Sequence, residues 1–237
     1  IEAAAYAAEF LPKGLEYRLE RVDAQEPLES TLNAAIQQVV HDLRHEPSGT
    51  TISAVLIDER HEQAAIAVLG DSPVVILPSD AHMAPFVAPQ HNVYLCESDL
   101  RAIQKRIDRR PEHILSGHPS IGNDYIWANE YHGCGINLTR AAGDQSFDGI
   151  ILRTPFLTTQ PFASGALLLL GSDGVRFDDE LAPTPTDRVW TRYAVATALA
   201  REGGGAREVA LLAKKIGRDG GYSLDNITVI TVSGGKE

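Results

Sequence analysis

The chain has 237 residues, 43% of them hydrophobic and 22% charged, which is an ordinary globular composition with enough length for a sizeable core. Its formal net charge of −11 argues against nucleic acid or an anionic membrane as the main partner, and no apolar stretch approaches the roughly 18 residues of a membrane span. The two cysteines, Cys96 and Cys134, form no CxxC pattern, which argues against a disulfide framework or a zinc site and favours a reducing, cytoplasmic setting.

The first part of the chain predicts two helices. Residues 1–11 are rich in alanine, and Pro12 is expected to end the helix that they form. Between Glu29 and His45 the apolar residues recur at the spacing of one helix face. The Pro-Ser-Gly sequence that follows marks the end of this second helix.

Three strands are predicted next, at Thr50–Ile57, Gln63–Leu69 and Pro73–Leu77. The polar residues 58–61 separate the first two strands, which indicates an antiparallel hairpin because the connection is so short.

Residues 78–136 mix proline, histidine and glycine with one amphipathic stretch at Leu100–Ile107. We interpret this segment as an irregular flap or insertion that contains a short helix.

The last part of the chain predicts a buried strand at Gly165–Leu170, helices at Asp187–Arg201 and Ala206–Ile216, and a final strand at Asn226–Val232. Helices and strands therefore do not alternate regularly along the chain. This order predicts an α+β fold and not a parallel α/β sheet.

An aspartate stands at the end of each of three predicted core strands. Asp71 and Asp173 follow apolar strands, Asp225 precedes one, and each has glycine or asparagine beside it, which suits a tight turn. A carboxylate there can cap a turn, pair with a cation or bind metal. If the three strands are neighbours, their oxygen ligands converge and suit Mg²⁺ or Mn²⁺.

Five segments together resemble the metal-dependent protein phosphatases of the PPM class, the protein phosphatase 2C family. In chain order they are SGTT (48–51), AIAVLGDSPVVIL (65–77), LTRAAGD (138–144), LLLLGSDGV (167–175) and SLDNITVITV (223–232). They resemble the family's Gly-Ser/Thr-Thr strand entry, its GDSR hairpin, and its LTRALGD, SDG and DNITVIVV segments. The resemblance covers most of the chain.

The resemblance implies two packed antiparallel β-sheets flanked by helices, a four-layer α-β-β-α sandwich, formed by residues 1–237 as a single phosphatase-like domain. It implies two or more Mg²⁺ or Mn²⁺ ions. Asp173 and Asp225 would bind the same catalytic ion, and Asp71 would help to hold a further, weaker one with Asp173. The ions would activate a water that attacks phosphorus in line.

The resemblance also implies a segment that would precede Ile1. In the family, an Asp-Gly pair that bridges the two ions, a phosphate-binding arginine and often a histidine lie near the N-terminus. We therefore expect this sequence to be N-terminally incomplete. No histidine of the chain occupies that turn, so none is assigned a catalytic role.

These patterns predict metal-dependent hydrolysis of phosphoserine or phosphothreonine on proteins. The expected partner is a phosphorylated protein. One alternative is a catalytically impaired pseudophosphatase that serves as a binding or regulatory module. Another is a regulator of one dedicated partner, as in bacterial stress signalling.

Residues outside the three aspartates receive structural interpretations. Asp144 is expected to cap a turn, and Cys134 to be buried. Arg106, Arg109 and Arg110 are expected to form a solvated helix face, with substrate selection as the alternative.

Overall fold

The computed structural model describes residues 2–21, 26–80, 82–93, 95–110, 112–117, 124–128, 134–173, 175, 205–219 and 228–235. The chain forms two compact units. The first comprises Ile1–Ala54, Ile66–Asp71 and Gln90–Thr158, and the second comprises Val55–Ala65, Ser72–Pro89 and Thr159–Glu237. The helix predicted at Asp187–Arg201 lies outside the described residues.

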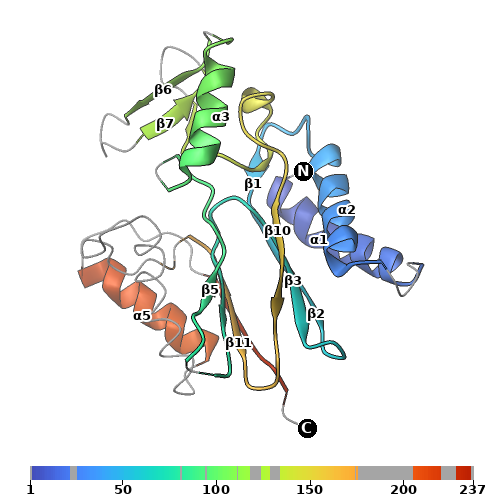
Figure 1. Ribbon diagram of the computed structural model, residues 1–237. Helices are drawn as coiled ribbons and strands as arrows, with labels where there is room; N and C mark the ends of the chain where they lie inside the picture. The colour runs from blue at the N-terminus through green and yellow to red at the C-terminus, as the bar shows by residue number, and fades with distance from the viewer. Residues whose placement is uncertain are drawn as a thin grey trace. The chain divides into compact units, whose positions relative to one another are not determined.

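Helices α1 (Ala3–Leu19) and α2 (Leu28–Asp42) lie side by side in the first unit (Figure 1). The predicted second helix is confirmed, and its buried face includes Leu32, Ile36 and Val39, at the spacing of one helix face.

The prediction that Pro12 ends the first helix is wrong, because α1 continues to Leu19 with Pro12 inside it. A proline in a helix removes one backbone hydrogen bond and is unfavourable. The immediate neighbours Leu11 and Lys13 are good helix formers, and α1 packs along α2, so tertiary contacts outweigh the local preference of Pro12.

A four-stranded antiparallel sheet lies in the second unit, in the order β12 (Val229–Ser233), β11 (Leu167–Gly171), β4 (Val74–Leu77), β5 (Phe86–Val87). Leu168 of β11 stands opposite both Val232 and Ile76. Every residue of β4 is buried, which explains its unbroken apolar sequence. Helix α5 (Ala206–Asp219) packs against β12.

A second sheet has the order β10 (Phe156–Pro161), β3 (Gln63–Leu69), β2 (Ile52–Asp58). Its strands continue from the residues of one unit into those of the other. The predicted hairpin is confirmed, because β2 and β3 are hydrogen-bonded neighbours joined by four residues. The central strand β3 is buried from Ala64 to Leu69, and this apolar run leads directly to Gly70.

Residues 78–136 contain more regular structure than we predicted. Helix α3 (Glu97–Ile107) confirms the expected short helix. A three-stranded antiparallel sheet, β6 (Ile114–Gly117), β7 (Asp124–Trp127) and β8 (Gly135–Ile136), was not predicted. Its strands have two to four residues, too few for a clear alternation of apolar and polar side chains.

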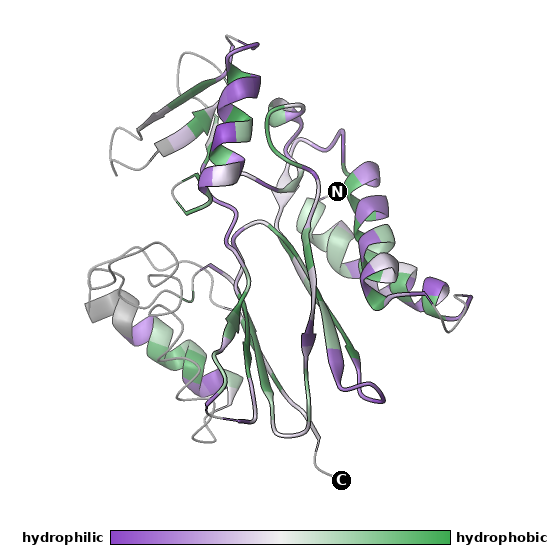
Figure 2. Ribbon diagram, in the orientation of Figure 1, coloured by the Kyte–Doolittle hydropathy of each residue, from purple (hydrophilic) through white to green (hydrophobic). Residues whose placement is uncertain are grey.

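Helix α3 and the small sheet share a core with the segment after β8. In Figure 2 the hydrophobic and hydrophilic colours alternate along α3, as expected for a helix with one buried face. The segment after β8 also contains β9 (Ala142–Gly143), which pairs with β1 (Gly49–Thr50), and the 3₁₀ turn Gln145–Phe147. The buried members of the shared core are Val93, Ile103, Ile107, Ile126, Ala141, Phe147, Ile150 and Ile151.

The predicted α+β class with antiparallel sheets is confirmed. Among the described residues, no helix combines the length and the apolar character that crossing a bilayer requires.

Candidate functional site

Asp71 occupies the turn directly after β3, in the first unit. The buried strand ends at Leu69, and Gly70 then adopts a φ of 118°, a conformation that glycine tolerates far better than other residues. Asp71 itself is only 5% exposed. The sequence therefore places a buried carboxylate in a turn that depends on its glycine.

Residues distant in sequence hold this turn. The backbone N–H of His91 donates to the Gly70 carbonyl at 2.9 Å, and Nδ1 of the same histidine lies 3.1 Å from that oxygen. The side-chain amide of Gln90 donates to the Asp71 carbonyl, also at 2.9 Å. Thr51 packs so closely against Gly70 that no side chain would fit there. The backbone on both sides of the Gly70–Asp71 peptide bond is thus fixed by buried contacts.

A buried ion pair lies next to His91. Arg140 donates to both carboxylate oxygens of Asp99, at 2.7 and 2.8 Å, and Thr139 donates to the same carboxylate at 3.0 Å. Burial raises the pKa of Asp99, but the hydrogen bonds from Arg140 and the charge of Arg140 outweigh that effect, so the pKa is lowered overall. Burial, reinforced by the charge of Arg140, lowers the pKa of His91 to about 4. His91 is therefore neutral near pH 7.

Asp173 occupies the corresponding position after β11, in the second unit. It is half-buried and lies in a turn. Ser172 continues the pairing of β11 with β12, because its N–H donates to the Thr228 carbonyl at 3.0 Å and its hydroxyl accepts from the Thr228 N–H at 3.0 Å. The N–H of Val175 closes the turn on the Ser172 carbonyl at 3.0 Å.

The third candidate ligand, Asp225, lies outside the described residues, three positions before Thr228 in sequence. Asp71 and Asp173 both offer carboxylate oxygens at the ends of core strands, as the sequence predicted. Such oxygens fit the ligand preference of Mg²⁺ and Mn²⁺. The convergence of the three aspartates remains a prediction.

Three other interpretations change with the structure. Cys134 was expected to be buried but is exposed. Asp144 lies at the start of the 3₁₀ turn with a φ of 53°, yet its side chain makes no capping hydrogen bond there. Arg106 and Arg110 do more than face solvent, because they donate to backbone carbonyls of residues 148–151 at 3.0 Å.

The fold matches solved structures, among them several protein phosphatases. A Caenorhabditis elegans sex determining protein superposes with a TM-score of 0.72 at 21% identity over 97% of this chain, which spans about half (52%) of that protein's length. A serine-threonine phosphatase 2C from Toxoplasma gondii gives 0.71 at 13% identity, covering 96% of this chain and 80% of the other. The PPM Ser-Thr phosphatase MsPP from Mycobacterium smegmatis gives 0.51 at 22% identity, covering 97% and 80%.

No family model matches the sequence, and no curated protein does. The structural matches nevertheless agree with the resemblance seen in the five sequence segments. The chain therefore has the fold of the PPM-type serine/threonine phosphatases.

Sequence reasoning found the aspartates at the strand ends but missed the residues that support the first of them. Gln90 and His91, which contact this turn, and Asp99, which pairs with Arg140, all lie in the segment that the sequence indicates to be an irregular flap. Arg140 lies within the recognised LTRAAGD segment, where its sequence neighbours gave no indication of a partner 41 residues away. A buried acidic residue on the apolar face of α3 is the signal that could have suggested such a pair.

Proposed function

We propose that this chain belongs to a metal-dependent protein serine/threonine phosphatase, in which Asp71, Asp173 and Asp225 bind Mg²⁺ or Mn²⁺. The proposal is carried by the structural match between 96% of this chain and the T. gondii phosphatase 2C. It is supported by the aspartates that lie in the turns after β3 and β11. The substrate class proposed is phosphoserine or phosphothreonine in proteins.

Divalent ions, when bound, supply an activated water and positive charge beside the phosphoryl oxygens. Residues of this chain would bind such ions and hold them in place. The turn of Asp71 is suited to it because the buried contacts of Gln90 and His91 restrict its movement. The M. smegmatis phosphatase was solved with cacodylate, a tetrahedral oxyanion like phosphate, which agrees with a phosphate-binding role for this fold.

The test is phosphate release from a phosphothreonine peptide by the full-length protein, with Mn²⁺ and with EDTA. We expect release that requires Mn²⁺. Asp173→Asn should lower kcat by more than the roughly 10- to 100-fold that loss of an outer-shell partner costs, because Asn removes the charge that holds the ion. The control substitution Asp108→Asn should leave activity unchanged, because Asp108 is exposed at the end of α3.

Absence of Mn²⁺-dependent release from the folded wild-type protein would contradict the catalytic proposal, as would full activity in Asp173→Asn. Partner binding that survives EDTA in a protein without hydrolytic activity would favour the regulatory-module alternative.

A further inference from the structure

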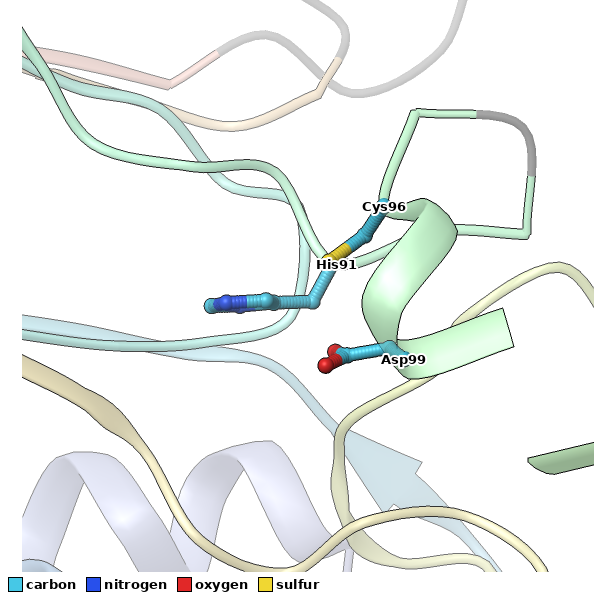
Figure 3. Close-up of side chains that lie close together, drawn as sticks. All are labelled: His91, Cys96 and Asp99. Atoms are coloured by element: carbon cyan, nitrogen blue, oxygen red, sulfur yellow. The ribbon is translucent and has the colours of Figure 1, made fainter. Parts of the chain in front are cut away.

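Three side chains with metal-binding atoms meet at the start of helix α3 (Figure 3). A ring nitrogen of His91, the sulfur of Cys96 and a carboxylate oxygen of Asp99 lie within 4.8 Å of one another. We propose that these three residues form a binding site for Zn²⁺ or a chemically similar transition-metal ion. The site would consist of different residues from the aspartates proposed for Mg²⁺ or Mn²⁺.

The types of ligand define which ions the site would prefer. Nitrogen from histidine, sulfur from cysteine and oxygen from a carboxylate are typical zinc ligands, whereas Mg²⁺ and Mn²⁺ prefer oxygen alone. The absence of a CxxC pair argues against zinc in the sequence, but this cluster requires no such pair. Cys96 is the N-cap of α3, Asp99 lies in the first turn, and the chain before the helix supplies His91.

The hydrogen bond of the His91 imidazole determines which of its nitrogens can bind a metal. Its Nδ1 lies 3.1 Å from the Gly70 carbonyl, which can only accept a hydrogen bond, so Nδ1 carries the proton. The lone pair of Nε2 then remains for an ion, and the bond to Gly70 fixes the ring as outer-shell partners do in metal sites.

Asp99 keeps an acceptor position although Arg140 binds it. Oδ2 accepts two hydrogen bonds, from Arg140 Nε and from Thr139, whereas Oδ1 accepts one, from Arg140 at 2.8 Å. Each carboxylate oxygen has about two acceptor sites, so one site on Oδ1 remains for a metal. The charge of Arg140 opposes a cation. Zn²⁺ binding releases the thiol proton of Cys96, and the new thiolate offsets that repulsion.

The geometry requires a small contraction of the cluster. Bond lengths of about 2.0–2.3 Å around a tetrahedral Zn²⁺ place neighbouring ligand atoms about 3.3–3.8 Å apart, so the three side chains would approach one another by about 1 Å. His91 is 1% and Asp99 3% exposed, whereas Cys96 is only partly buried. An ion would therefore enter past Cys96, and a water on that side would complete the four ligands.

The test is a titration of the reduced full-length protein with Co²⁺ and then Zn²⁺, in excess Mg²⁺ so that oxygen-only sites are filled. Co²⁺ bound by a cysteine gives a thiolate-to-metal charge-transfer absorption, which Zn²⁺ should abolish by displacement. We expect this band in the wild type and also in Cys134→Ser. That variant is the matched control, because Cys134 is exposed and is not one of the three proposed ligands. Cys96→Ser should lose the band and bind Zn²⁺ at least about tenfold more weakly.

The site is refuted if the wild type gives no thiolate band, or if the band persists in Cys96→Ser and disappears in Cys134→Ser. A circular-dichroism spectrum of Cys96→Ser shows whether the variant is folded, and Cys96→Ala provides a second variant if it is not. None of these measurements depends on phosphatase activity, so the metal site and the proposed catalytic function can fail separately.

Discussion

The turn after β3 and the turn after β11 both carry an aspartate out of an apolar strand, but different contacts hold them. Asp71 is buried, and Gln90 and His91 bind the backbone of its turn. Asp173 is half-buried, and its turn is tied to Thr228 by an extension of the pairing between β11 and β12. The first turn thus depends on residues distant in sequence, and the second on its neighbouring strand. Substitutions in and near each turn should reveal this difference.

The largest effect is expected from Asp99→Ala, because Asp99 belongs to the buried network next to His91. The substitution leaves the guanidinium of Arg140, with a side chain 18% exposed, without its carboxylate partner. Removing one member of a buried ion pair costs about 3–5 kcal/mol. Urea unfolding in EDTA should show a loss of this size in the free energy of unfolding.

Asp108→Ala is the matched control for that measurement, since Asp108 is an exposed aspartate at the end of the same helix. Its effect should be below about 0.5 kcal/mol. Similar losses in the two variants would mean that the pair of Asp99 and Arg140 contributes no more than a surface carboxylate.

The two glycines that precede these aspartates give the next largest difference. At Gly70 an alanine would combine a φ of 118° with a collision against Thr51, and we expect a loss of about 2–4 kcal/mol. At Gly171 the φ is not in the left-handed region, and the nearest side-chain atoms, of Val175 and Pro73, would lie 3.0 and 3.3 Å from the new Cβ. Gly171→Ala should therefore cost about 1 kcal/mol or less.

Urea unfolding of both alanine variants measures this contrast. The double variant Gly70→Ala/Thr51→Gly removes the colliding side chain but keeps the unfavourable φ, so its comparison with Thr51→Gly alone isolates the backbone contribution. Equal losses for Gly70→Ala and Gly171→Ala would show that the two turns tolerate a side chain equally well.

The part of this architecture that could be predicted is the part encoded in local sequence. Strand β3 matches its predicted bounds, Gln63–Leu69, because an unbroken apolar run ends at Gly70-Asp71. The aspartates at strand ends follow from the same pattern. The support of the Asp71 turn could not be predicted, because Gln90 and His91 contact residues 19 and 21 positions earlier in the chain, and only folding brings them together. The continuation of α1 through Pro12 was likewise decided by packing and not by propensity.

The smallest expected effect concerns Asp144. In this carboxyl group of the first unit, the effect of burial on the pKa is larger than the opposing effect of a nearby guanidinium. Burial raises the pKa of Asp144, and the charge of Arg153 only partly opposes the shift, whereas the pKa of Asp99 is lowered. Between the ordinary pKa of 3.8 and the raised value, the folded protein keeps a proton that the unfolded chain has released. This contribution to stability is present below pH 3.8 and is lost as the pH rises through the raised pKa.

Asp144→Asn cannot ionise, so it should lack this pH dependence. The free energy of unfolding of Asp144→Asn minus that of the wild type should therefore increase as the pH rises from 3.8 towards neutrality, and then become constant. Urea unfolding of both proteins at a series of pH values measures that difference, and its slope is informative even if the asparagine changes the absolute stability. A difference that falls with rising pH would mean that Arg153 stabilises the charged carboxylate more than burial destabilises it, and Asp144 would then resemble Asp99.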